Sequence, residues 1–156
     1  MTHARQQIRE AAAALLKAAA PTTWGLVFET RIPSARAVMP YLMIFSDGES
    51  MAADSINLPG VYLRDLNMHV VGRIRLPGNN DTETVEDRMD ALAAEVETKL
   101  KFSAIVATLT QVKSLRIAST EMNVVVDDQD APQFAEITMS FVARYATAEA
   151  LPETFI

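Results

Sequence analysis

One stretch near the middle of the chain constrains the fold more than any other. From Leu63 to Leu76 apolar and polar side chains alternate. One face carries Leu66, Met68, Val70, Ile74 and Leu76, with Gly72 between them. The other face carries Asp65, Asn67, His69, Arg73 and Arg75, interrupted only by Val71. Alternation with a period of two predicts a strand with one buried face. At ~3.3 Å per residue this strand spans ~46 Å, more than the ~40 Å diameter of a globular chain this size. We therefore expect it to cross the whole domain and to contact something outside it.

The remaining periodic segments complete an α+β pattern. Apolar residues at helical spacing predict two helices, and β-branched or alternating runs predict four further strands. The helices are expected at 2–20 and 82–101, and these strands at 24–32, 38–46, 111–126 and 134–145. The alternation changes phase near Ala118 to Thr120, which predicts a β-bulge. The order α-β-β-β-α-β-β indicates a mostly antiparallel sheet with two helices packed on one face.

Two segments lack a clear period. We expect a loop or ragged edge from Glu49 to Gly60 and an extended C-terminal tail over 146–156. Met51 in the first segment, and Phe155 and Ile156 in the second, are apolar residues with no evident core to join. Exposed apolar groups in loops and tails often mark contacts with partners. The whole chain, 1–156, is expected to form a single domain.

Composition excludes several function classes. The chain carries a net charge of −6, which argues against nucleic acid as its main ligand. It contains no cysteine, so disulfide frameworks, thiolate nucleophiles and cysteine-based zinc sites are ruled out. The apolar N-terminal segment is interrupted by Arg5, Arg9, Glu10 and Lys17, unlike a signal peptide or a membrane-spanning helix. We therefore expect a protein made in the cytosol with no membrane partner.

Candidate chemistry is sparse. His69 has Asp65 and Asn67 on its own sheet face, and a carboxylate–imidazole pair is a minimal acid–base unit. The alternative is a polar sheet face that contacts water or a partner, and we favour it. An acidic turn could offer oxygen ligands to calcium, but it lacks the glycine and distal glutamate of a calcium-binding hand. That turn contains Asp127, Asp128 and Asp130. We expect no catalytic, cofactor-binding or metal-binding residue, and no enzyme activity.

The polar face of the long strand admits one more interpretation. His69, Arg73 and Arg75 together hint at a nucleic-acid-binding sheet, but no aromatic residues are interleaved for base stacking. We interpret this face as part of a subunit contact. The candidate interface residues are thus Met51, His69, Arg73, Arg75, Phe155 and Ile156.

Several motifs in a shared order give the chain a family resemblance. They lie at 3–9, 31–33, 39–45, 86–97, 115–121 and 141–147. Together they resemble the tail terminator (minor tail) proteins of long, non-contractile-tailed bacteriophages. Met39-Pro40 stands where that family usually has a Leu-Pro pair before an aliphatic strand. The resemblance covers most of the chain, and the segment from Glu49 to Pro59 departs from it.

The resemblance implies a structural role in the virion. Proteins of this family form a ring, generally a hexamer, on the end of the tail tube. The ring stops tube growth and offers a docking surface to the head-completion or connector protein, while DNA passes through without specific binding. The resemblance places the protein in the neck region of the tail, assembled in the host cytoplasm. The rival interpretations are a head–tail joining or other tail subunit, a small-molecule enzyme and a nucleic-acid-binding sheet.

Overall fold

The computed structural model describes residues 3–18, 20–32, 37–52, 60–76, 82–125 and 134–148, and the backbone of 151–155. Three helices are present: α1 (Ala4–Lys17), α2 (Val85–Lys99) and α3 (Phe102–Thr108). Six strands form one sheet: β1 (Leu26–Phe28), β2 (Tyr41–Met51), β3 (Val61–Arg75), β4 (Val112–Val125), β5 (Phe134–Ala148) and β6 (Leu151–Phe155). The strand order is β1-β2-β3-β5-β4, and β6 pairs with β5. The predicted α+β class and element order are confirmed, with α3 and β6 as additions.

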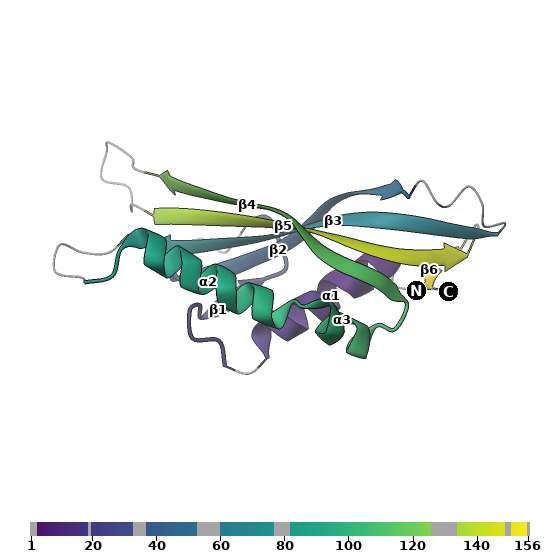
Figure 1. The fold of residues 1–156 in the computed structure, drawn as a ribbon, viewed down its shortest axis with the longest axis horizontal. Helices are drawn as coiled ribbons and strands as arrows, with labels where there is room; N and C mark the ends of the chain where they lie inside the picture. Colours follow the sequence, from purple (N-terminus) through teal and green to yellow (C-terminus); the bar gives the residue numbers. More distant parts are fainter. Residues whose placement is uncertain are drawn as a thin grey trace.

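The three helices all lie on one face of the sheet, and none of them covers the other, which we call the open face (Figure 1). The open face still buries a small apolar cluster of Tyr41, Met43 and Val71. The main core fills the space between the two layers. From β3 it takes Leu66, Met68, Val70 and Ile74, the apolar face that the alternation predicted. Leu92 and Val96 of α2 pack against this face. The sheet is antiparallel except for the β1–β2 pair, which is parallel.

The α2 helix begins with a capping box. The Thr84 side chain accepts a hydrogen bond from the Asp87 backbone N–H, and Asp87 accepts one from the Thr84 backbone N–H, both at 3.1 Å. This reciprocal pair satisfies two of the backbone donors that a helix start leaves free. The hydrogen bond that the Thr84 backbone N–H donates holds the pKa of the Asp87 carboxyl below its usual value. The carboxylate therefore stays charged at the positive end of the helix dipole.

The β2 strand is longer than predicted. The strand expected at 38–46 continues past Asp47, through a register shift between Ser46 and Gly48, and pairs with β3 as far as Met51. The bulge breaks the alternation, which is why the sequence reads as a strand end there. The expected loop therefore starts later, and residues 53–59 lie outside the described residues. Side chains of Tyr41 to Ile44 are buried on both faces of β2. Leu42 and Ile44 join the main core, while Tyr41 and Met43 join a second, smaller cluster on the opposite face.

Other boundaries also differ from the prediction. The strand expected at 24–32 is only Leu26–Phe28. The helix expected to reach 101 ends at Lys99, and the separate helix α3 follows it. The predicted bulge in β4 is present as a register shift between Ile117 and Ser119. Of the segment 146–156, expected to be a tail, the first residues extend β5 to Ala148, and Leu151–Phe155 returns to pair with it.

Candidate subunit interfaces

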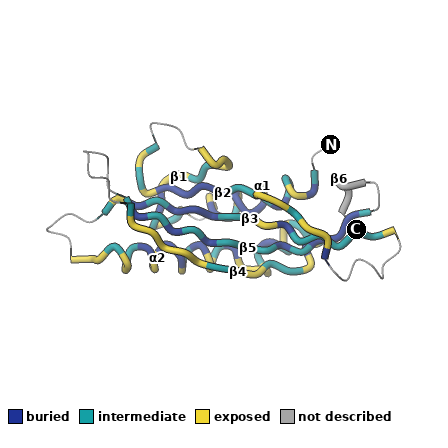
Figure 2. Tube along the Cα trace, turned by 90° about the horizontal axis from the view of Figure 1, so that it is seen from above, coloured by how far each residue is buried: buried dark blue, intermediate teal, exposed yellow. Residues whose placement is uncertain are grey.

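Exposed large apolar side chains gather at the two opposite edges of the sheet. Among the described residues there are eight of them, with exposed fractions between 39% and 81%. Four belong to β1, β2 and the connection between these strands: Leu26, Ile32, Val38 and Met51. We call this set the β1 edge. The other four belong to α3 and β4, and we call them the β4 edge: Phe102, Ile117, Met122 and Val124. Figure 2 shows β1 and β4 at opposite margins of the sheet.

The β4 edge combines exposed apolar side chains with free backbone groups. β4 pairs with β5 on one side, and in the described part of the chain no strand pairs with its other side. Soluble proteins usually blunt such an edge with lysine, proline or a bulge. The first half of β4 has Lys113 and two register shifts, whereas residues 119–125 have no lysine, proline or register shift and carry a single charged side chain, Glu121. This second half is therefore open to pairing.

The β1 edge is open for a shorter length. Within the described ranges, β1 has only β2 as a neighbour. Past the end of β1, the edge of β2 is partly blocked, because the Arg31 guanidinium donates a hydrogen bond to the Ser46 carbonyl at 3.1 Å. The Arg31 guanidinium also stacks over the Phe45 ring, 4.9 Å from its centroid. The free strand on this side is thus β1 itself.

Glu95 of α2 fixes the segment that leads into β1. Its carboxylate accepts hydrogen bonds from the backbone N–H and the hydroxyl of both Thr22 and Thr23, at 2.8–3.2 Å. Burial disfavours the charged carboxylate, but these donors outweigh it, and the pKa of Glu95 lies below its usual value. A charged group in the helix layer therefore holds the lead-in to β1 in place.

The open face of the sheet carries cross-strand polar pairs. The His69 ring lies between Ser140, with Nδ1 3.0 Å from its hydroxyl oxygen, and Asp47, with Nε2 2.8 Å from a carboxylate oxygen. Asp65 is not a partner of His69. It accepts two hydrogen bonds from Arg144, at 2.8 and 2.9 Å, and these hold the pKa of Asp65 below its usual value. The Asp65–His69 pair considered from the sequence is therefore not formed. His69 instead contacts the Asp47 carboxylate, a pairing that the sequence did not predict.

Arg73 is similarly engaged on the open face. Its Nε donates to Glu136 at 2.6 Å, and its Nη1 donates to the Tyr41 hydroxyl at 3.3 Å. Its guanidinium also lies 5.0 Å from the centroid of the Phe134 ring. Burial opposes the charged form of Arg73, but its hydrogen bonds to Glu136 and Tyr41 more than compensate and raise its pKa. This cation is neutralised within the chain.

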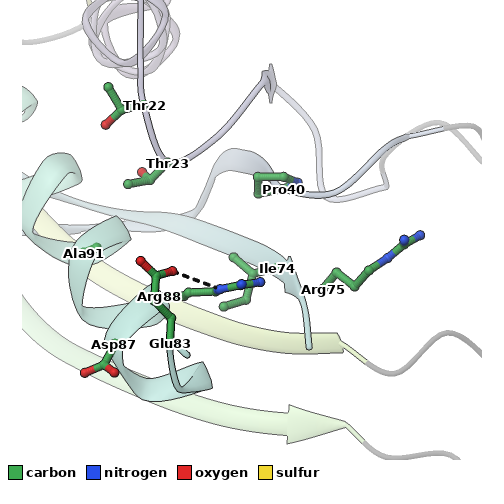
Figure 3. Close-up of a pocket in the computed structure, with 9 residues that line it drawn as sticks. All are labelled: Thr22, Thr23, Pro40, Ile74, Arg75, Glu83, Asp87, Arg88 and Ala91. Carbon is green, nitrogen blue, oxygen red and sulfur yellow. Dashed lines mark hydrogen bonds and ion pairs between the residues drawn. The ribbon is translucent and has the colours of Figure 1, made fainter. Parts of the chain in front are cut away.

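A cavity of about 350 Å³ lies between the start of α2, the end of β3 and the segment before β1 (Figure 3). Arg75 lines it but extends away from Glu83 and Arg88, which pair with each other at 3.3 Å. The other carboxylate that lines the cavity, Asp87, caps the start of α2 by accepting a hydrogen bond from the Thr84 backbone N–H. His69 is not among the lining residues. Both carboxylates therefore have structural roles, and the cavity does not join the candidate acid–base residues.

A second polar cluster lies on the helix side of the sheet. The Tyr145 hydroxyl donates to Glu49 at 2.7 Å, Arg64 forms an ion pair with the same carboxylate, and Arg64 Nε donates to the Thr147 hydroxyl at 3.1 Å. Burial disfavours charge on Glu49, but Tyr145 and Arg64 outweigh it and lower its pKa. Burial and the bond to Glu49 raise the pKa of Tyr145. The cluster joins β2, β3 and β5 near one end of the sheet.

The structure places the predicted interface residues in different surroundings. Met51 is exposed at the β1 edge. His69 and Arg73 lie on the open face, and Arg75 ends β3. Phe155 ends β6, and Ile156 lies outside the described residues, as do Asp127, Asp128 and Asp130. Sequence reasoning missed most of both edges. It named only Met51 among the eight edge residues, and no local signal showed that the strand containing Ile117, Met122 and Val124 lies at the margin.

The described residues contain no group of three or more His, Cys, Asp or Glu side chains placed to hold a metal ion. Within the same residues, none of the helices is both long enough and apolar enough to cross a membrane. No protein-family model and no curated protein sequence matches the chain.

Proposed function

We propose that this protein is a structural subunit of a phage tail that assembles into a ring on the end of the tail tube. The ring stops addition of further tube subunits and presents a docking surface for the head-completion or connector protein. This role follows the family that the sequence motifs resemble. One face of the ring binds the tube end as a further tube subunit would, and the other face lacks the surface that accepts the next subunit. The protein carries out no reaction.

The observation that supports the proposal most is the pair of apolar edges. A cyclic ring uses heterologous contacts, so every subunit needs two different patches that fit each other. The β1 edge and the β4 edge are two different apolar patches on opposite sides of one sheet. A dimer with twofold symmetry would need only one self-complementary patch. The position of the two edges thus favours a closed ring or a filament.

Electrostatics supports the same role. Two arginines of the open sheet face are held by carboxylates, Arg73 by Glu136 and Arg144 by Asp65. Binding to the DNA backbone requires unpaired lysine and arginine side chains that displace counterions. Such pairing, together with the net charge of −6, suits a ring through which DNA passes without specific binding.

The direct test uses purified protein and purified tails that lack heads. We expect negative-stain images to show annular particles, either in solution or at one end of the tail tubes. Mass measurement in solution then gives the number of copies. A head–tail joining protein would instead bind heads and leave the tube ends bare. Protein that forms no ring and binds neither end of the tubes would refute the proposal.

A further inference from the structure

The residue pairings of the sheet place β1 and the second half of β4 at the same level. One row of paired residues runs across β1, β2, β3, β5 and β4, from one edge to the other. It consists of Leu26, Tyr41, Arg73, Glu136 and Asn123. A second row, two residues away, consists of Phe28, Met43, Val71, Thr138 and Glu121. β1, the free strand of the β1 edge, therefore lies at the same level of the sheet as residues 119–125 of β4.

Strand directions make the two edges compatible. β1 runs parallel to β2, and the direction then alternates through β3, β5 and β4. β1 and β4 of one copy thus run in opposite directions. When a second copy stands beside the first in the same orientation, its β1 meets β4 as an antiparallel neighbour. Antiparallel pairing is slightly more stable per residue than parallel pairing.

The side chains of the two strands also match. A third row, between the other two, has Val27 at one end and Met122 at the other. Met122 is exposed, and Val27 packs partly against the main core on the helix side. Leu26 is exposed at the other end of the row that contains Asn123. Joining the edges brings Met122 beside Val27 of the next copy and covers apolar surface on both. It also pairs backbone groups that each copy alone leaves to solvent.

We infer that in the ring proposed above, on which this inference rests, β1 of one copy pairs with residues 119–125 of β4 in the next copy. The sheets then form one continuous antiparallel surface around the ring. The occupant of each apolar edge is the opposite edge of a second copy of this chain. The contact is heterologous, because β1 never meets β1 and β4 never meets β4.

Cysteine cross-linking tests this pairing, and a chain without native cysteine makes the result clear. Leu26→Cys is combined in turn with Glu121→Cys, Asn123→Cys or Val125→Cys. These three positions alternate along one side of β4, so they allow for a shift of two residues between copies. Opposed residues of an antiparallel pair have Cα atoms about 4.5–5.5 Å apart, within the range of about 4.4–6.8 Å that a disulfide spans. We expect one of the three pairs to give a ladder of covalent species, on oxidation, that ends at the copy number of the ring.

The controls separate this inference from the proposed function. Each single-cysteine variant, and the same-edge pair Leu26→Cys/Met51→Cys, should stay uncross-linked. Covalent dimers from a single variant would show a self-complementary contact and overturn the inference. Rings seen by electron microscopy without a ladder from any of the three pairs would also overturn it, while the ring function would stand. If the unmodified protein forms no ring, even with tail tubes, the proposed function itself fails.

Discussion

Gly72 of β3 lies directly against Leu92 of α2. A Cβ atom at Gly72 would stand 2.9 Å from Cδ2 and 3.0 Å from Cδ1 of Leu92, closer than carbon atoms normally approach. It would also lie 3.1 Å from Cγ2 of Ile137 on the neighbouring strand. The glycine thus allows α2 to pack closely on the centre of the sheet. The sequence showed this residue only as a gap in the apolar face of the long strand.

The first prediction concerns this contact. Gly72→Ala should lower the free energy of unfolding by about 1–3 kcal/mol, because Leu92 and Ile137 must shift to make room in a packed core. Chemical denaturation measures the change. Gly48→Ala is the matched control, since nothing lies within 4 Å of its added Cβ. We expect the control to change the free energy by less than about 0.5 kcal/mol. Equal effects of the two substitutions would contradict the packing argument.

The second prediction concerns Asp65 and its hydrogen bonds to Arg144. The pKa of Asp65 is lower in the folded protein than its ordinary value of 3.8. A depressed folded-state pKa contributes stability above the unfolded-state pKa, and this stability is lost as the pH falls through the folded-state pKa. Asp65→Asn should therefore destabilise the protein by about 0.5–1 kcal/mol near neutral pH, because the pair is partly exposed. The difference from wild type should shrink below pH ~4.

Urea denaturation at a series of pH values gives this difference directly. Asp90→Asn serves as the control, since it removes one negative charge from an exposed position of α2 that has no ion-pair partner among the described residues. A destabilisation by Asp65→Asn that stayed constant down to pH ~2 would show that Arg144 does not set the pKa of Asp65.

The third prediction concerns Tyr145 and Glu49. Tyr145→Phe removes the hydroxyl that donates to the Glu49 carboxylate in a largely buried site. Hydrogen bonds to charged groups contribute about 1.5–3 kcal/mol, so a loss of this size is expected in the free energy of unfolding. A double-mutant cycle with Glu49→Gln isolates the interaction. Purely additive effects of the two substitutions would show that the hydroxyl and the carboxylate do not act together.

The sequence predicted the parts of the fold that depend on local pattern. The spacing of apolar residues predicts which faces of β3 and β5 are buried. The same spacing predicts the helices α1 and α2 and the bulge near Ile117. Helix α3 was missed because it buries only Ile105 and shows no period. The two edges were missed for another reason. Their position depends on β5 lying between β3 and β4, and this long-range pairing leaves no local signal.

The last prediction links the helix layer to the β1 edge. Glu95 holds Thr22 and Thr23, the residues just before β1, by hydrogen bonds to both carboxylate oxygens. Glu95→Ala should leave the core intact but free this segment. Losing these hydrogen bonds should cost about 1.4 kcal/mol of local stability. This corresponds to a roughly tenfold rise in the fraction of molecules in which the segment around β1 is locally unfolded. Hydrogen exchange at the amides of Leu26–Phe28 should therefore become about ten times faster, while exchange in β3 changes little.

Assembly provides the second measurement of the same variant. If β1 forms half of the contact between copies, a looser β1 must be ordered again on binding, and this entropy cost weakens the ring. Sedimentation should show more monomer for Glu95→Ala than for wild type at equal concentration. Glu10→Ala, at an exposed position of α1, removes the same charge without touching Thr22 or Thr23 and should behave as wild type. Faster exchange in β1 with unchanged assembly would place the contact between copies elsewhere on the sheet.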